Sequence, residues 1–392
     1  MRKRGKSSKL LGVKSNLSKP SYNQNVHKKP EQTASATQPL IEGRVDALLG
    51  GGLSLAIAIV VIIWGSFSET KMNTALGFIV AYLFTDLLIN SPHFMASYRI
   101  LYSNKRNIRR HPFVTLVLPV CAISLLAYVC YWGPLNTTSD LKAGVPQPSV
   151  MLALTYLAPI FLGWHYVGQS WGTTACFAYL AGFRMNPSQR KLIRFGFLSL
   201  FAYHLTWACA SMEILEQLFP QQRAGEFMIK AVMSVCRVLV LASFFAGLWG
   251  FFQISQEHKR RIPATVWLPW VATYSWYVMV DVYPKSFFLL QIFHALQYLM
   301  FPARVEINQH HTKHVPKHML IYYVALVLVG YLAFDWTKLL EGIDLANQTG
   351  TMVLLGAATM MCINIHHYFI DAVIWKIREP EVRESLFGHL ET

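Results

Sequence analysis

Long apolar segments recur along this chain almost to its C-terminus, and they constrain the fold more than any other feature. A helix needs about 20 predominantly apolar residues to cross the roughly 30 Å hydrocarbon core of a bilayer. Ten segments fit this requirement: 45–65, 73–102, 112–132, 149–182, 192–216, 228–254, 264–282, 285–303, 318–335 and 350–377. We therefore predict an all-α fold, a polytopic transmembrane helical bundle of about ten spans.

The composition also favours a membrane protein. The chain is 54% hydrophobic and 14% charged, whereas soluble globular chains carry about 25% charged residues. The six cysteines all lie in apolar segments and form no CxxC pair. We therefore interpret them as small buried hydrophobic residues, not as metal ligands or a redox pair.

The N-terminal region differs from the rest. Residues 1–44 contain ten Lys and Arg against two acidic residues, and are rich in Ser, Asn, Gln, Thr and Pro. This composition predicts a disordered basic tail. Because the tail precedes a membrane span, its positive charge is better explained by contact with anionic lipid, or by a role in fixing the topology, than by binding to nucleic acid. The expected domains are a cytoplasmic tail at 1–44, a transmembrane domain at 45–377 and a short cytoplasmic C-terminal tail at 378–392.

Basic residues in the loops predict the orientation. With the N-terminal tail inside, the inner loops and C-terminal segment carry 17 Lys and Arg, and the outer loops carry five. The positive-inside rule then predicts that both termini are cytoplasmic, in a bacterial cytoplasmic membrane or a eukaryotic endomembrane.

The fourth segment is too long for one straight crossing, so Gly168, Gly172 and Gly182 suggest a break or an interfacial tail.

Histidines lie at a similar depth in four predicted spans. Histidine is costly in lipid, so an intramembrane histidine points to function. His93, His294 and His367 lie about 13–15 Å from the inner ends of their helices, at 1.5 Å per residue. His165 matches this depth only if its helix ends near residues 172–175. A polar residue follows each histidine by four positions, on the same helix face: Ser97, Gln169, Tyr298 and Asp371.

This pattern predicts a metal site with His93, His165, His294 and His367 as ligands. Asp371 is a further ligand, or the partner that orients His367. Adjacent residues on a helix point about 100° apart, so His366 cannot readily share the site. It faces a neighbouring helix or a second metal.

A second histidine group lies between two predicted spans. His310, His311, His314 and His318 fall within nine residues, and imidazole suits Zn, Fe and Cu. We include His310, His311 and His314 among the candidate metal ligands, although Pro316 argues against one continuous helix. The alternative is a solvated basic patch at the membrane surface.

Two polar residues elsewhere in the spans leave alternatives open. A lone histidine such as His204 is better explained by a hydrogen bond between helices. Arg237, within the sixth span, could pair with Asp86 or bind an anionic head group.

Short patches resemble two groups of membrane enzymes. His310/His311/His314 and His366/His367 approximate the HxxxH and HxxHH motifs of the histidine-motif non-haem iron oxygenases of the fatty-acid desaturase and hydroxylase type. His367-x3-Asp371 and Ser91-Pro92-His93-Phe94 are similar to motifs of the bacterial membrane β-carotene-cleaving oxygenases. The resemblance implies non-haem iron and a lipophilic substrate. It does not cover the whole chain, and the predicted spans outnumber those of most desaturases.

The leading hypothesis is therefore an integral-membrane, metal-dependent oxidoreductase, similar to an oxygenase, desaturase or hydroxylase. Its cofactor is expected to be non-haem iron, with zinc as an alternative, and its partners are the bilayer, a lipophilic substrate and an electron donor. No residue beyond the metal ligands is assigned to catalysis. One alternative is a haem b protein with two facing histidines as axial ligands. Another is a proton-coupled transporter with a His/Asp/Arg relay and broken helices.

Overall fold

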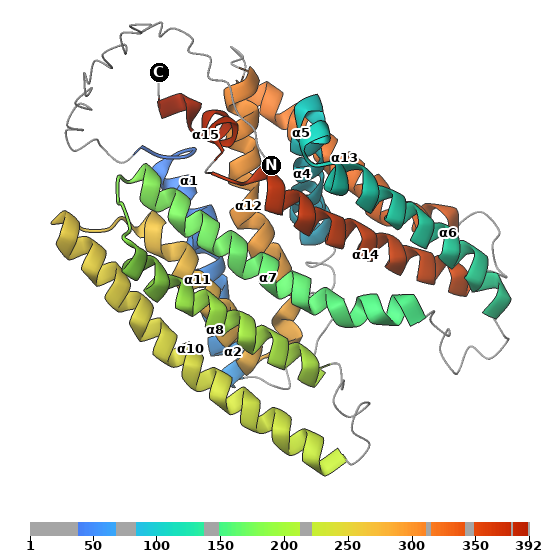
Figure 1. The fold of residues 1–392 in the computed structure, drawn as a ribbon, viewed down its shortest axis with the longest axis horizontal. Helices are drawn as coiled ribbons and strands as arrows, with labels where there is room; N and C mark the ends of the chain where they lie inside the picture. Colours follow the sequence, from blue (N-terminus) through green and yellow to red (C-terminus); the bar gives the residue numbers. More distant parts are fainter. Residues whose placement is uncertain are drawn as a thin grey trace, which may run out of the picture. The chain divides into compact units, whose positions relative to one another are not determined.

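The structure is a computed structural model, and it describes residues 38–67, 84–136, 149–211, 222–310, 315–341, 349–377 and 379–390. These residues form helices and no β-strand, which confirms the all-α prediction (Figure 1). Most of the predicted basic tail lies outside them. The α-helices are α1 (Gly43–Ala47), α2 (Leu53–Phe67), α4 (Ser91–Ser103), α5 (Lys105–Arg110), α6 (Leu118–Asn136), α7 (Ser149–Leu180), α8 (Pro187–Ser211), α10 (Gln222–His258), α11 (Ala264–Val282), α12 (Phe287–His310), α13 (Val315–Glu341), α14 (Thr349–Ile374) and α15 (Pro380–Phe387).

Six helical stretches among the described residues are long and apolar enough to cross a membrane, and they indicate an integral membrane protein. They are Gly43–Trp64, Phe113–Tyr131, Pro187–Ser211, Phe227–His258, Pro284–His310 and Val315–Trp336. α7, α11 and α14 are long helices but are not among the six. The count of ten spans stays a prediction.

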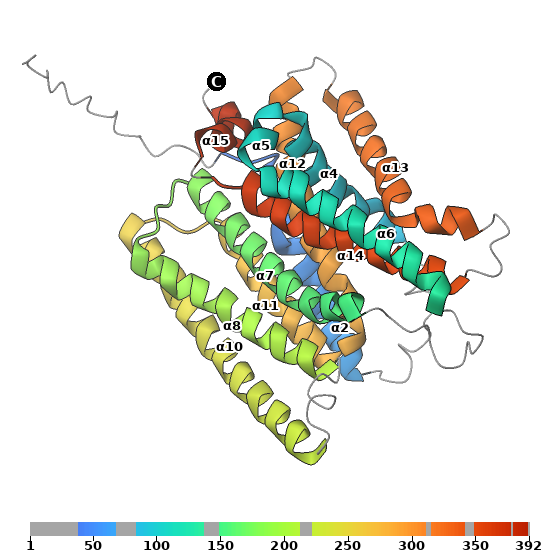
Figure 2. The same ribbon diagram turned by 45° about the vertical axis from the view of Figure 1, so that its right-hand side comes forward.

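α7 and α12 lie between two groups of helices (Figures 1 and 2). One group contains α2, α8, α10 and α11, and the other contains α4, α6, α13 and α14. α12 contacts α4, α7, α11, α13 and α15. Its apolar stretch is 61% buried, the largest share among the six stretches. A polar side chain on α12 therefore faces other helices rather than lipid.

α7 is one continuous helix, so the predicted break near Gly168 and Gly172 is wrong. It ends in a Schellman motif, in which Gly182 has a φ of 74° and its N–H donates to the carbonyl of Tyr179 at 3.0 Å. A Cβ atom added at Gly168 or Gly172 would meet nothing within 4 Å. These two glycines leave open space beside the helix and do not interrupt it.

A turn of π-helix, Asp86–Asn90, leads directly into α4. Pro92 lies in the first turn of α4 and has no N–H to offer the carbonyl of Leu88, four residues earlier. The Tyr323 hydroxyl of α13 donates to this carbonyl instead. α13 thus fixes the start of α4, immediately before His93.

We expect both chain termini to face the cytoplasm, because loop Lys and Arg divide 17 to five between the two sides. Reporter domains fused before Met1 and after Thr392 should both report a cytoplasmic location. An external signal from either reporter would show that the number of spans differs from ten by an odd number or that the orientation is reversed.

Candidate metal centre

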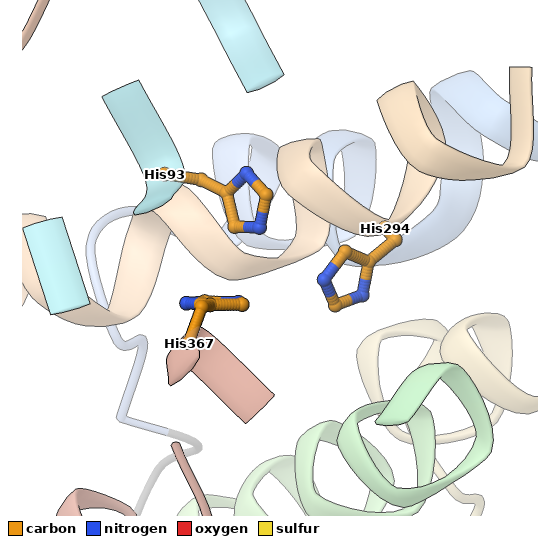
Figure 3. Close-up of side chains that lie close together, drawn as sticks. All are labelled: His93, His294 and His367. Carbon is orange, nitrogen blue, oxygen red and sulfur yellow. The ribbon is translucent and has the colours of Figure 1, made fainter. Parts of the chain in front are cut away.

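Three of the predicted histidines point at one another in the interior of the bundle (Figure 3). His93 comes from α4, His294 from α12 and His367 from α14, and one ligand atom of each lies within 4.8 Å of the other two. Their exposed fractions are 1%, 2% and 0%. The structure therefore brings together three residues that lie far apart in the sequence.

α7 adds His165 to this cluster. The Nε2 atom of His165 lies 3.1 Å from Nε2 of His294 and 3.2 Å from Nε2 of His367. Two nitrogens bound to one metal at 2.0–2.1 Å lie about 2.8–3.4 Å apart for bond angles from 90° to tetrahedral. The same spacing fits an N–H···N hydrogen bond. His165 joins the cluster although α7 ends at Leu180, because the end of such a long helix is a poor reference for depth.

Asp371 of α14 faces the same nitrogens with one carboxylate oxygen. Its Oδ2 atom lies 3.5 Å from Nε2 of His367 and 3.8 Å from Nε2 of His165. Its Oδ1 atom accepts hydrogen bonds from the Ser97 hydroxyl at 2.8 Å and the Tyr298 hydroxyl at 3.0 Å. One oxygen is thus held by the protein, while the other is directed at the histidines.

Three of the residues that follow the histidines by four positions, Ser97, Gln169 and Tyr298, bind groups on neighbouring helices. Ser97 and Tyr298 contact Asp371 and each other, and the indole of Trp375 donates to the Tyr298 hydroxyl at 3.0 Å. The Gln169 amide donates to the backbone carbonyl of His294 at 2.9 Å. This network ties α4, α7, α12 and α14 together around the cluster.

Hydrogen bonding leaves ring nitrogens of the cluster available to a cation. Nδ1 of His93 lies 2.5 Å from the carbonyl of Asn90, which fixes the proton on Nδ1 and leaves the Nε2 lone pair free. Within the part of the chain that the structure describes, Nε2 of His93, Nδ1 of His294 and Nδ1 of His367 are buried and have no hydrogen-bond partner. Buried polar atoms are nearly always paired, so three such nitrogens in one cluster fit a metal ion.

His310 and His318 do not join this cluster. His310 lies on α12, 16 residues after His294, or about 24 Å along the helix axis. Its Nδ1 atom lies 3.4 Å from the Glu306 carboxylate, which also contacts His318 at 2.9 Å and pairs with Arg99. His310 is therefore far from the intramembrane cluster, but it belongs with Glu306 and His318 to a separate group whose potential ligand atoms lie within 4.8 Å of one another. His311 and His314 lie outside the described residues.

Two further histidines are bound by other helices. Nδ1 of His366 lies 2.9 Å from the Tyr98 hydroxyl, and Nε2 lies 2.7 Å from the carbonyl of Val114. Both ring nitrogens of His366 are therefore occupied, and the residue faces a neighbouring helix as expected. His204 contacts the Tyr277 hydroxyl at 3.1 Å, an interhelical bond of the kind predicted for it.

The suggested pairing of Arg237 with Asp86 is wrong. Arg237 forms two hydrogen bonds to Asp281, at 3.0 and 2.7 Å. Asp86 accepts a hydrogen bond from the side-chain amide of Asn90 at 2.7 Å. Arg237 and Asp86 therefore each bind a different residue and do not pair with each other.

A cavity of about 520 Å³ reaches the cluster between α7 and α14. His165, Tyr298 and Asp371 line it where it meets the metal-binding groups. Most of its remaining wall is aromatic or aliphatic. A largely apolar pocket with a few convergent polar groups is the usual form of a small-molecule site.

Comparison with models of known families, with curated proteins and with solved structures found no match to this chain. The functional interpretation therefore rests on the cluster and its cavity.

Proposed function

We propose that this protein is an integral-membrane oxidoreductase that uses non-haem iron to act on a lipophilic substrate. The observation that supports this most strongly is the convergence of four buried histidines and Asp371 beside an apolar cavity, whose wall includes His165 and Asp371. An intramembrane ionisable group is costly unless it has a function or a partner, and here five such groups converge.

The ligand types suit non-haem iron. His165, His367 and Asp371 form a group of two imidazoles and one carboxylate, the set that binds Fe(II) in many non-haem oxygenases. Neutral imidazoles add no charge to a low-dielectric interior, and a single carboxylate offsets part of the charge of the ion. His93 and His294 form a second group of potential ligands with His367, and they would extend the site or hold a second ion.

Iron bound at this position would supply one-electron chemistry with dioxygen and an external electron donor. The protein residues would position and shield that chemistry. Ser97 and Tyr298 hold Oδ1 of Asp371 and so keep Oδ2 directed at the histidines. Aromatic side chains along the cavity exclude water from the substrate.

The packing of the histidine rings argues against haem b. Bis-histidine ligation places a porphyrin between two axial imidazoles. Here the ring centroids of His165 lie 4.6 Å from those of His294 and 4.9 Å from those of His367. His93 packs edge-to-face on His294 and His367 at 5.1 and 4.8 Å. A small ion fits between these rings, and a porphyrin does not.

The relay expected of a transporter has less support. It requires Asp86 and Arg237 to connect with the histidine layer, but Arg237 pairs with Asp281. Discontinuous helices are common in such carriers, yet α7 continues through Gly168 and Gly172.

Metal analysis of the protein purified in detergent tests the proposal. We expect one or two equivalents of iron per chain after anaerobic loading with Fe(II), and no Soret absorption. Iron, zinc, copper and haem should be measured in the same preparation. Stoichiometric haem, or folded protein that retains none of these metals after loading, would contradict the proposed function.

A further inference from the structure

The cavity beside the metal centre has different chemistry at its two ends. At the end beside the histidine cluster, away from Lys376, the wall contains Phe161, Trp164 and Phe369. Toward the C-terminal ends of α7 and α14, the wall contains Gln169, Thr173 and Lys376, beside aliphatic side chains. From the geometry we propose that the substrate is an amphipathic lipid with an anionic head group, a carboxylate or a phosphate, which binds Lys376. This inference rests on the proposed function for the reaction at the other end.

The direction of the two helices sets this polarity. α7 and α14 lie side by side and run the same way (Figures 1 and 2). His165 and Thr173 are eight residues apart, about 12 Å along α7, and share one face. On α14, Asp371 precedes Lys376 by five residues. Both helices therefore run from the candidate metal ligands toward the end of the cavity that contains Thr173 and Lys376. A lipid whose head group binds at that end would extend its apolar chain along the cavity past the histidine cluster.

Two polar atoms at this end lack hydrogen-bond partners within the described residues. The Thr173 hydroxyl belongs to a side chain that is 1% exposed, and neither Oγ1 of Thr173 nor Oε1 of Gln169 has a partner. Both residues line the cavity. The Thr173 hydroxyl can donate to an oxygen atom of a head group, whereas Oε1 of Gln169 can only accept a hydrogen bond, for example from a protonated head-group oxygen.

Lys376 supplies the positive charge. Among the described residues, no ion pair joins Lys376 to a carboxylate. The acidic side chains that follow it in the sequence are engaged elsewhere, since Glu379 binds Arg110 at 2.7 Å and Glu381 binds Arg106 at 2.8 Å. A partly buried ammonium group at the end of an apolar cavity favours an anionic ligand over a neutral one.

Two glycines make room for the chain of such a ligand. Gly168 and Gly172 line the cavity, and a Cβ atom at either position would meet no atom within 4 Å. A larger side chain at Gly172 would therefore fill the cavity without disturbing helix packing. Gly43 also has no atom near an added Cβ and lies outside the cavity lining, so it provides a matched control.

Binding of brominated lipids tests the proposal, because bromine quenches the fluorescence of the cavity residues Trp164 and Trp375 on contact. The protein, in nanodiscs of neutral phosphatidylcholine, is titrated with dibromostearic acid, its methyl ester and a dibrominated alkyl phosphate of equal chain length. The variants are Lys376→Gln, Lys376→Arg, Gly172→Leu and Gly43→Leu. Iron content is measured in every sample.

We expect an anion, carboxylate or phosphate, to bind at least about tenfold more tightly than the ester, as a charged hydrogen bond implies. Lys376→Gln should remove this preference and leave ester binding unchanged, whereas Lys376→Arg should keep it. Gly172→Leu should weaken all three ligands, and Gly43→Leu should not. Equal binding of acid, phosphate and ester, or an unchanged preference in Lys376→Gln, would overturn the anionic head group. Loss of iron with intact anion selectivity would instead contradict only the proposed function.

Discussion

Substitution of His367 by alanine is expected to abolish metal binding while the protein still inserts into the membrane. His367 is fully buried and belongs to both groups of ligand atoms in the cluster. Its loss therefore affects every arrangement of ligands, and no neighbouring imidazole can refill the position. The change makes the span more hydrophobic, so insertion should not suffer. Metal content and membrane integration of the purified variant check both parts.

The adjacent residue provides the control. His366 is on the same turn of α14, but both of its ring nitrogens are bound, to Tyr98 and Val114. His366→Ala should lower thermal stability, since each lost hydrogen bond contributes about 0.5–1.5 kcal/mol, and should keep its metal. If the two variants retain equal amounts of metal, the last long helix takes no part in a metal site.

Asp371→Asn is expected to weaken iron binding by more than about 100-fold, which exceeds the usual effect of a residue that only orients a ligand. The reason is the direction of Oδ2, which lies 3.5 Å from the same His367 nitrogen that faces His165. Asparagine keeps the shape of the side chain and an acceptor for Ser97 and Tyr298, but it removes the negative charge. Iron titration of the variant under anaerobic conditions gives the change in affinity.

Tyr298→Phe and Ser97→Ala separate the charge of Asp371 from its placement. Each variant removes one of the two donors to Oδ1 and leaves the carboxylate in place. A decrease of about 10–100-fold is expected for such an orienting contact. A loss as large as that of Asp371→Asn in either variant would mean that position, and not charge, dominates the role of Asp371.

Much of the candidate site follows from the spacing of residues on single helices. The four-residue spacing correctly places Ser97, Tyr298 and Asp371 on the faces of His93, His294 and His367, because helix geometry fixes which side chains share a face. It cannot show which groups then bond, since that depends on packing between helices. For this reason the link between Ser97 of α4 and Asp371 of α14 could not be predicted.

The errors have similar physical causes. The span predicted from the sequence ends at residue 303, before His310. The prediction therefore missed that His294 and His310 lie on one helix, too far apart to share an ion. Glycines at positions 168 and 172 are compatible with a kink and with a groove, and only the neighbouring helices distinguish the two. The partner of Arg237 lies 44 residues away on another helix, so charge alone could not identify it.

The order of the ligands along the chain also determines when the site can form during biosynthesis. His93 and His367 are 274 residues apart, so at 5–20 residues per second the ribosome needs roughly 14–55 seconds to add the last histidine after the first. Until α14 joins the bundle, His93, His165 and His294 are synthesised without His367 and Asp371. Loading of the proposed metal would therefore follow integration of nearly the whole chain, and a nascent chain stalled before α14 would expose an incomplete set of candidate ligands to the translocation machinery.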